Sequence, residues 1–89
     1  MANIRNLKKD LNNTMGDIIE AAYIYQLANP KTDSAKSEEI VDEAIETFDE
    51  LIVKINDRSV ENRAKHLKTL NKEIEERAKV LIEKLNKLP

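Results

Sequence analysis

The sequence predicts an all-α protein: an antiparallel three-helix bundle of long helices, completed by dimerisation. Apolar residues recur at helical spacing in three segments, and one glycine and two prolines are too few for a turn-rich β fold. The 89 residues form a single domain, 1–89, that buries only about 60 to 65 per cent of its unfolded surface. Such small domains usually need disulfides, a metal or self-association. With no cysteine and one histidine in the chain, we expect a homodimer.

The first helix is predicted over about residues 3–29. Its apolar residues fall within about 80° of arc at 100° per residue. The helix should end before Pro30, because the residue preceding a proline is pushed away from helical angles. The stripe that should face the core consists of Ile4, Leu7, Leu11, Met15, Ile18, Ala22 and Tyr25.

The second helix is predicted over about residues 37–56, after the linker PKTDSAKS. Asp33, Ser34 or Ser37 is the expected N-cap, because their side-chain oxygens accept from the free amides of a first turn. The predicted core stripe is Val41, Ala44, Ile45, Phe48, Leu51, Ile52 and Ile55.

The third helix is predicted over about residues 60–88, with Ser59 as its N-cap. Its apolar residues repeat every seven positions, which is typical of a coiled-coil seam. Asn71 interrupts this seam, where an amide either sets the register of the pairing or simply lies at the wet boundary. The seam positions are Val60, Ala64, Leu67, Asn71, Ile74, Ala78, Leu81, Leu85 and Leu88.

Charge is sorted along the chain although the net charge is only −2. Residues 33–57 hold nine acids and two lysines, whereas residues 58–89 hold nine basic residues and five acids. The second and third helices should therefore pack as antiparallel neighbours. The lysines of the third helix alternate with glutamates and lack aromatic partners, which argues against nucleic-acid binding.

The stretch MGDIIEAAYIYQLA, residues 15–28, carries more apolar surface than two neighbouring helices cover. Gly16 costs helix stability relative to alanine, which indicates a close backbone approach or a kink. Three coverings are open: the 30–37 linker, a second copy of the chain, or an unidentified protein partner. We favour the second copy, with the interface at Gly16, Ile19, Tyr23, Ile24 and Leu27.

The sequence offers no catalytic constellation, and we expect a non-enzymatic protein with no cofactor and no metal. Asp17 and Glu20 fall on the solvent side of the first helix, and neither belongs to a Glu-x-x-His pair of the kind that binds di-iron centres. There is no glycine-rich phosphate loop and no cysteine nucleophile. An interaction or adaptor module is the function that these observations favour.

The alternative function is phosphotransfer centred on His66. The run His66-Leu67-Lys68-Thr69-Leu70 loosely resembles the His-x-Leu-Lys-Gly motif of histidine phosphotransfer domains, with the lysine one residue early and threonine in place of glycine. The resemblance implies that the imidazole of His66 would accept the phosphoryl group.

The chain has no apolar run near the roughly 20 residues that a membrane span requires, and we expect a cytoplasmic protein without membrane contact. The stretches IRNLKKDLNNTMGDIIEAAY and NRAKHLKTLNKEIE resemble a small bacterial family of uncharacterised all-helical proteins. That resemblance implies a compact helical bundle and no particular activity.

Overall fold

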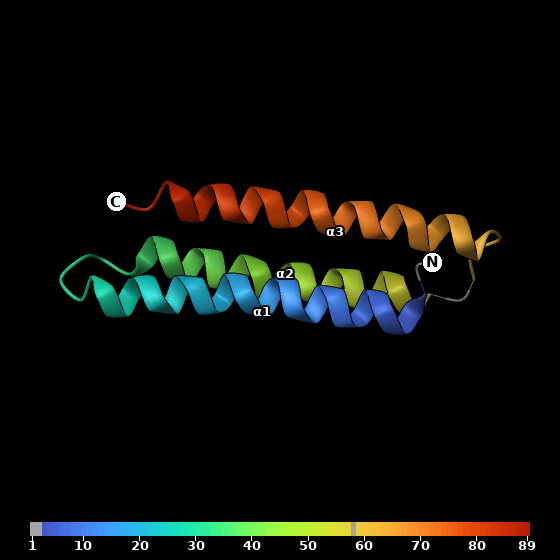
Figure 1. Cartoon of the computed structure of the whole chain (residues 1–89), viewed down its shortest axis with the longest axis horizontal. Helices are drawn as coiled ribbons and strands as arrows, with labels where there is room; N and C mark the ends of the chain where they lie inside the picture. Colours follow the sequence, from blue (N-terminus) through green and yellow to red (C-terminus); the bar gives the residue numbers. More distant parts are fainter. Residues whose placement is uncertain (1–2, 58) are drawn as a thin grey trace.

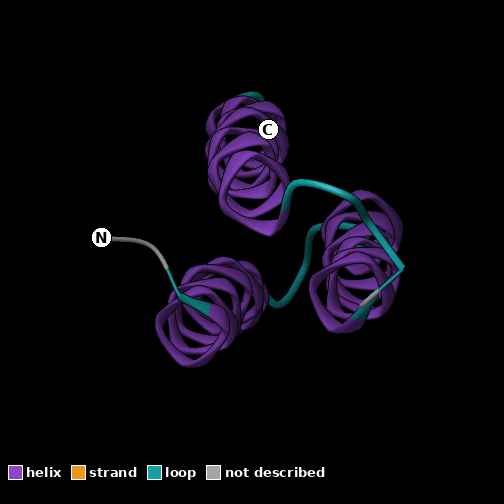
Figure 2. Cartoon of the chain, turned by 90° about the vertical axis from the view of Figure 1, so that its right-hand side faces the viewer, coloured by secondary structure: helices purple, strands orange, loops and turns teal. Residues whose placement is uncertain are grey.

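The computed structural model describes residues 3–57 and 59–89, which form three long helices. They are α1 (Ile4–Ala28), α2 (Ala35–Asn56) and α3 (Arg63–Asn86). The helices run up, down and up along a rod of 51 × 19 × 17 Å (Figure 1). Seen along the rod, they occupy the corners of a triangle (Figure 2). The predicted all-α three-helix bundle is confirmed.

Helix α1 begins and ends where local sequence signals place it. The side chain of Asn3 accepts a hydrogen bond from the Asn6 amide at 2.8 Å, which satisfies one free donor of the first turn. The helix ends at Ala28, and the backbone N–H of Asn29 donates to the carbonyls of Tyr25 and Gln26 before the chain reaches Pro30. The predicted helix end before Pro30 is confirmed.

Helix α2 begins two residues earlier than predicted. Ser34 occupies the N-cap position without a side-chain hydrogen bond, and Asp33 Oδ1 accepts from the Ala35 amide at 3.0 Å. Ser37, one of the three candidate caps, lies inside the helix and is buried. Its hydroxyl donates to the Ser34 carbonyl and accepts from the side-chain amide of Gln26 on α1.

Helix α3 begins three residues later than predicted, and the expected N-cap at Ser59 is wrong. Asn62 caps the helix instead, since its side chain accepts from the Lys65 amide at 3.1 Å. Ser59 has another partner: its hydroxyl and its amide both donate to Asp57 Oδ1. Consequently Val60 precedes the helix, and Ala64 is exposed in its first turn.

The core is an aliphatic column contributed by all three helices. The centre of the predicted α1 stripe is buried as expected, whereas the predicted stripes of α2 and α3 are only partly right. On α2, Ile45 is 47 per cent exposed and Phe48 and Ile52 are half-buried. The buried apolar residues are Leu7, Leu11, Met15, Ile18, Ala22, Ile40, Val41, Ala44, Leu51, Ile55, Leu67, Leu70, Ile74, Ala78 and Leu81.

Ion pairs connect α2 to α3, as the charge distribution predicts. Glu43 pairs with Lys84 at 2.6 Å and Glu50 with Arg77 at 3.1 Å. The Lys54–Glu73 pair, at 2.9 Å, has the opposite polarity. All these side chains are partly exposed, so each pair stabilises the bundle by about 0 to 1 kcal/mol.

Between residues 3 and 89, leaving out position 58, no helix combines the length and hydropathy of a membrane span.

Candidate interaction surface

The far end of the predicted interface is uncovered in the folded chain. Tyr23 is 50 per cent exposed, Ile24 57 per cent and Leu27 81 per cent. The linker between α1 and α2 therefore does not fold over this end of α1. Tyr23 and Leu27 follow Ile19 at successive intervals of four residues, so the three side chains form one row on the helix surface.

Gly16 and Ile19 lie in a shallow groove between α1 and α2, of about 190 Å³. We call this hollow the Gly16 groove. Ile45 and Phe48 of α2 form its opposite wall, and the remaining lining residues are Asn12 and Met15. The sequence pattern assigned Ile45 and Phe48 to the core. The structure places them at its edge because α2 turns Ile40 and Thr47 inward instead.

The groove is open at the position where a side chain on Gly16 would point. A Cβ at this position would meet no atom of another element within 4 Å among residues 3–57 and 59–89. The close backbone approach predicted at Gly16 therefore does not occur within this part of the chain, and α1 runs through the residue as one continuous helix. The glycine leaves room at the surface that no part of the described chain fills.

Ile24 lies on another side of α1 from the other four residues of the predicted interface, of which Gly16 and Ile19 line the groove. At about 100° per residue, Ile24 lies roughly 140° round the helix from Ile19, away from the side that meets α2. The α2 side is marked by the hydrogen bond between Gln26 and Ser37 at 2.8 Å. Gly16, Ile19, Tyr23 and Leu27 therefore form one edge of α1, and Ile24 belongs to another.

The two acids inside the apolar stretch face solvent, as predicted. Asp17 and Glu20 are both exposed on α1. Within residues 3–57 and 59–89, no three histidine, aspartate or glutamate side chains come close enough to hold a metal ion.

His66 is half-buried, and its ring bonds to the end of a neighbouring helix. The Nε2 atom lies 2.8 Å from the Lys54 carbonyl oxygen in the last turn of α2, so Nε2–H donates to that carbonyl. The same carbonyl also accepts from the backbone N–H of Asp57 at 3.3 Å, so the imidazole is a second donor at the end of α2. The geometry gives His66 a structural role, while phosphotransfer at this residue stays a prediction from the sequence.

Asn71 is half-buried on α3. Among the described residues its amide makes no side-chain hydrogen bond, and no buried side-chain polar atom lacks a partner. The amide is therefore in reach of water, which favours the boundary position over a seam position within this chain. Its role in setting register stays a prediction.

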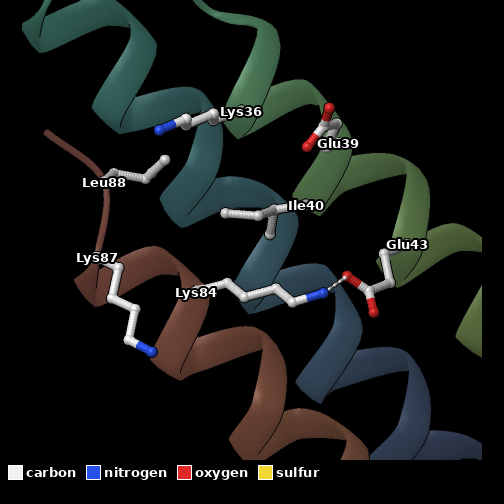
Figure 3. A pocket seen from close by; sticks show the side chains of 7 residues that line it. All are labelled: Lys36, Glu39, Ile40, Glu43, Lys84, Lys87 and Leu88. Carbon is white, nitrogen blue, oxygen red and sulfur yellow. Dashed lines mark hydrogen bonds and ion pairs between the residues drawn. The ribbon is translucent and has the colours of Figure 1, made fainter.

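A second hollow, missed by the sequence reasoning, lies where the start of α2 meets the end of α3. It measures about 260 Å³ and is drawn in Figure 3. Lys84 reaches across it to Glu43, and the remaining lysines do not point toward a common centre (Figure 3). Its walls mix both charge signs over an apolar floor. The lining residues are Lys36, Glu39, Ile40, Glu43, Lys84, Lys87 and Leu88.

The carboxyl group of Asp57 lies at the turn between α2 and α3 and accepts two hydrogen bonds. The side-chain hydrogen bond from Ser59, followed by the bond from the Ser59 amide, lowers the pKa of Asp57 below its ordinary value of 3.8. Both bonds favour the ionised carboxylate.

Comparison of the chain with protein-family models, curated proteins and solved structures finds no match. The resemblance to a small bacterial helical family stays a prediction from the sequence.

Proposed function

We propose that the chain is a non-enzymatic helical interaction module that self-associates through the exposed edge of α1. The observation that carries the proposal is the row of Ile19, Tyr23 and Leu27, which continues from a half-buried Ile19 in the Gly16 groove to the exposed Tyr23 and Leu27 at the end of the helix. A leucine that is 81 per cent exposed at the end of such a row is surface that a second molecule would remove from water.

Energetics support association at this edge. Burying an apolar side chain of this size stabilises a complex by about 1.5 to 3 kcal/mol. Tyr23 adds an aromatic ring with a polar tip, a combination enriched where proteins meet. A standard interface buries about 800 Å² on each partner, which one long face of a rod 51 Å in length can provide.

The test is the effect of Tyr23→Lys on the molar mass in solution, measured by light scattering. We expect the wild type to scatter as a dimer at tens of micromolar and the variant as a monomer of unchanged helicity, because the variant buries an ammonium group in the interface. Val53→Lys is the matched control, since Val53 is 70 per cent exposed on α2 and does not line the groove. That control should remain dimeric.

Two results would overturn the proposal. One is a wild type that stays monomeric up to millimolar concentration. The other is a wild-type dimer that Tyr23→Lys and Val53→Lys weaken equally, which would place the contact elsewhere.

A further inference from the structure

Gly16 lies at the midpoint of α1, with twelve helical residues on each side of it. The opposite wall of the groove, Ile45 and Phe48, lies near the middle of α2. The open groove is therefore centred along the rod. A two-fold axis that passes through the groove perpendicular to the rod would bring each half of α1 against the opposite half of a second α1.

Charge is distributed unequally about this midpoint. The half of α1 before Gly16 carries Arg5, Lys8 and Lys9 against one acid, Asp10. The half after it carries Asp17 and Glu20 and no cation. All the salt bridges among the described residues involve α2 or α3, so none occupies these α1 charges.

The exposed edge of α1 has the spacing of a helix-pairing seam. Lys9, Asn12, Gly16, Ile19 and Tyr23 follow one another at intervals of three and four residues, which is the repeat by which two helices pack along their length. All five residues are exposed or half-buried. Asn12, Gly16 and Ile19 of this seam line the groove, and Lys9 and Tyr23 extend the seam toward the two ends of α1.

We propose that a second copy of the chain packs antiparallel across the Gly16 groove, α1 against α1, with Gly16 facing Gly16 at the two-fold axis. This inference rests on the proposed self-association and specifies its geometry. About the axis, residues whose numbers add up to 32 face each other. Lys9 of each copy then lies over Tyr23 of the other, within reach of that copy's Glu20.

The charges select the antiparallel arrangement. In a parallel pair, Lys9 would face Lys9 and Glu20 would face Glu20, and like charges at such positions repel. In the antiparallel pair, the ammonium of Lys9 meets an aromatic face and a carboxylate. The glycine at the axis lets the backbones approach where the helices are closest, which accounts for its presence in mid-helix.

A charge-reversal mixture tests the geometry by sedimentation equilibrium. Lys9→Glu alone and Glu20→Lys alone should each weaken the dimer about tenfold, because two attractive contacts become repulsive. An equimolar mixture of the two variants should recover the wild-type dissociation constant to within a few-fold, as heterodimers. Lys72→Glu, which reverses an exposed charge on α3, should leave the dissociation constant unchanged.

Single cysteines give an independent reading, since the native chain has none. Arg5→Cys and Leu27→Cys should form no disulfide-linked dimers separately and should cross-link when mixed. A disulfide needs Cα atoms within about 7 Å. Each variant cross-linking only to itself would establish a parallel pair and overturn the inference.

The two proposals fail separately. A monomeric wild type would overturn the proposed function and this inference with it. A dimeric wild type that loses its dimer in Tyr23→Lys, with no recovery in the charge-reversal mixture, would keep the proposed function and overturn the antiparallel geometry.

Discussion

At the residue scale, Gly16 is unusual because the folded chain leaves its side-chain position empty. Glycine in the middle of a helix costs about 0.5 to 1 kcal/mol relative to alanine. A methyl group at this position would meet no neighbouring element among the residues that the structure describes. Contacts within the monomer therefore do not compensate for this loss of helix stability. In the proposed dimer, close packing against the second copy would compensate for it.

Gly16→Ala should raise the free energy of unfolding of the monomer by about 0.5 to 1 kcal/mol. It should also weaken self-association, because the added methyl group lies at the proposed axis. Urea denaturation at submicromolar concentration measures the first effect, and sedimentation equilibrium measures the second. A variant that is stabilised but dimerises as tightly as the wild type would show that Gly16 does not lie at a close contact.

Asp57 predicts a particular dependence of stability on pH. Because hydrogen bonds from Ser59 lower the pKa of this carboxyl in the folded state, its contribution to stability is present above the ordinary value of 3.8. The contribution is lost as the pH falls through the lowered folded-state pKa.

Asp57→Asn should therefore lower the thermal midpoint at pH 7, and the difference from the wild type should shrink as the pH is lowered below about 4. Thermal unfolding followed by circular dichroism at a series of pH values measures this. A constant difference across the series would mean that the carboxylate charge is not the source of the effect.

At the element scale, α1 was predictable and the facing of α2 was not. The apolar stripe of α1 is regular, and the residues at its centre are all apolar and all buried. In α2, Ser37 and Thr47 are buried, and the apolar pattern could not anticipate this. Each hydroxyl bonds to a carbonyl one turn earlier, Ser34 and Glu43 respectively, so burial leaves no unsatisfied donor. Thr47 also accepts from Arg77 on α3.

Leu51 and Ile45 both belong to the predicted core stripe of α2, but only Leu51 is buried in the structure. Leu51→Ala should cost about 2 to 5 kcal/mol of unfolding free energy, because Leu51 is fully buried and its loss opens a cavity. Ile45→Ala should cost under about 1 kcal/mol in the monomer, because Ile45 is half exposed. Urea denaturation of both variants under monomeric conditions measures the difference. Equal losses would contradict the observed facing of α2.

The beginning of α3 was misplaced for a related reason. Ser59 and Asn62 are both good N-cap residues, and propensity alone does not choose between them. Asp57 decides the outcome, since it binds Ser59 in the turn and leaves Asn62 to cap the helix. The heptad repeat correctly anticipated Leu67, Ile74 and Leu81 but not the burial of Leu70.

At the scale of the whole molecule, the sequence predicted that α1 carries surplus apolar surface. It did not predict that this surface is divided between the groove beside α2 and a separate side of α1 that carries Ile24. Helical angles already separate Ile24 from Ile19, whereas the groove depends on how α2 sits beside α1. Ile45 and Phe48 complete that groove, and their exposure follows from three-helix packing. The spacing of apolar residues in α2 does not by itself indicate where a neighbouring helix lies.

An odd number of helices has a consequence for anything attached to the chain. Tyr25, near the end of α1, donates a hydrogen bond to the carbonyl of Pro89, so the last residue lies at the far end of the rod from Asn3 (Figure 1). Groups joined to the two ends are held apart along a rod 51 Å in length. In an antiparallel pair, each end of the assembly would present one amino end and one carboxyl end. The two tips of such a pair would therefore carry the same set of chain ends.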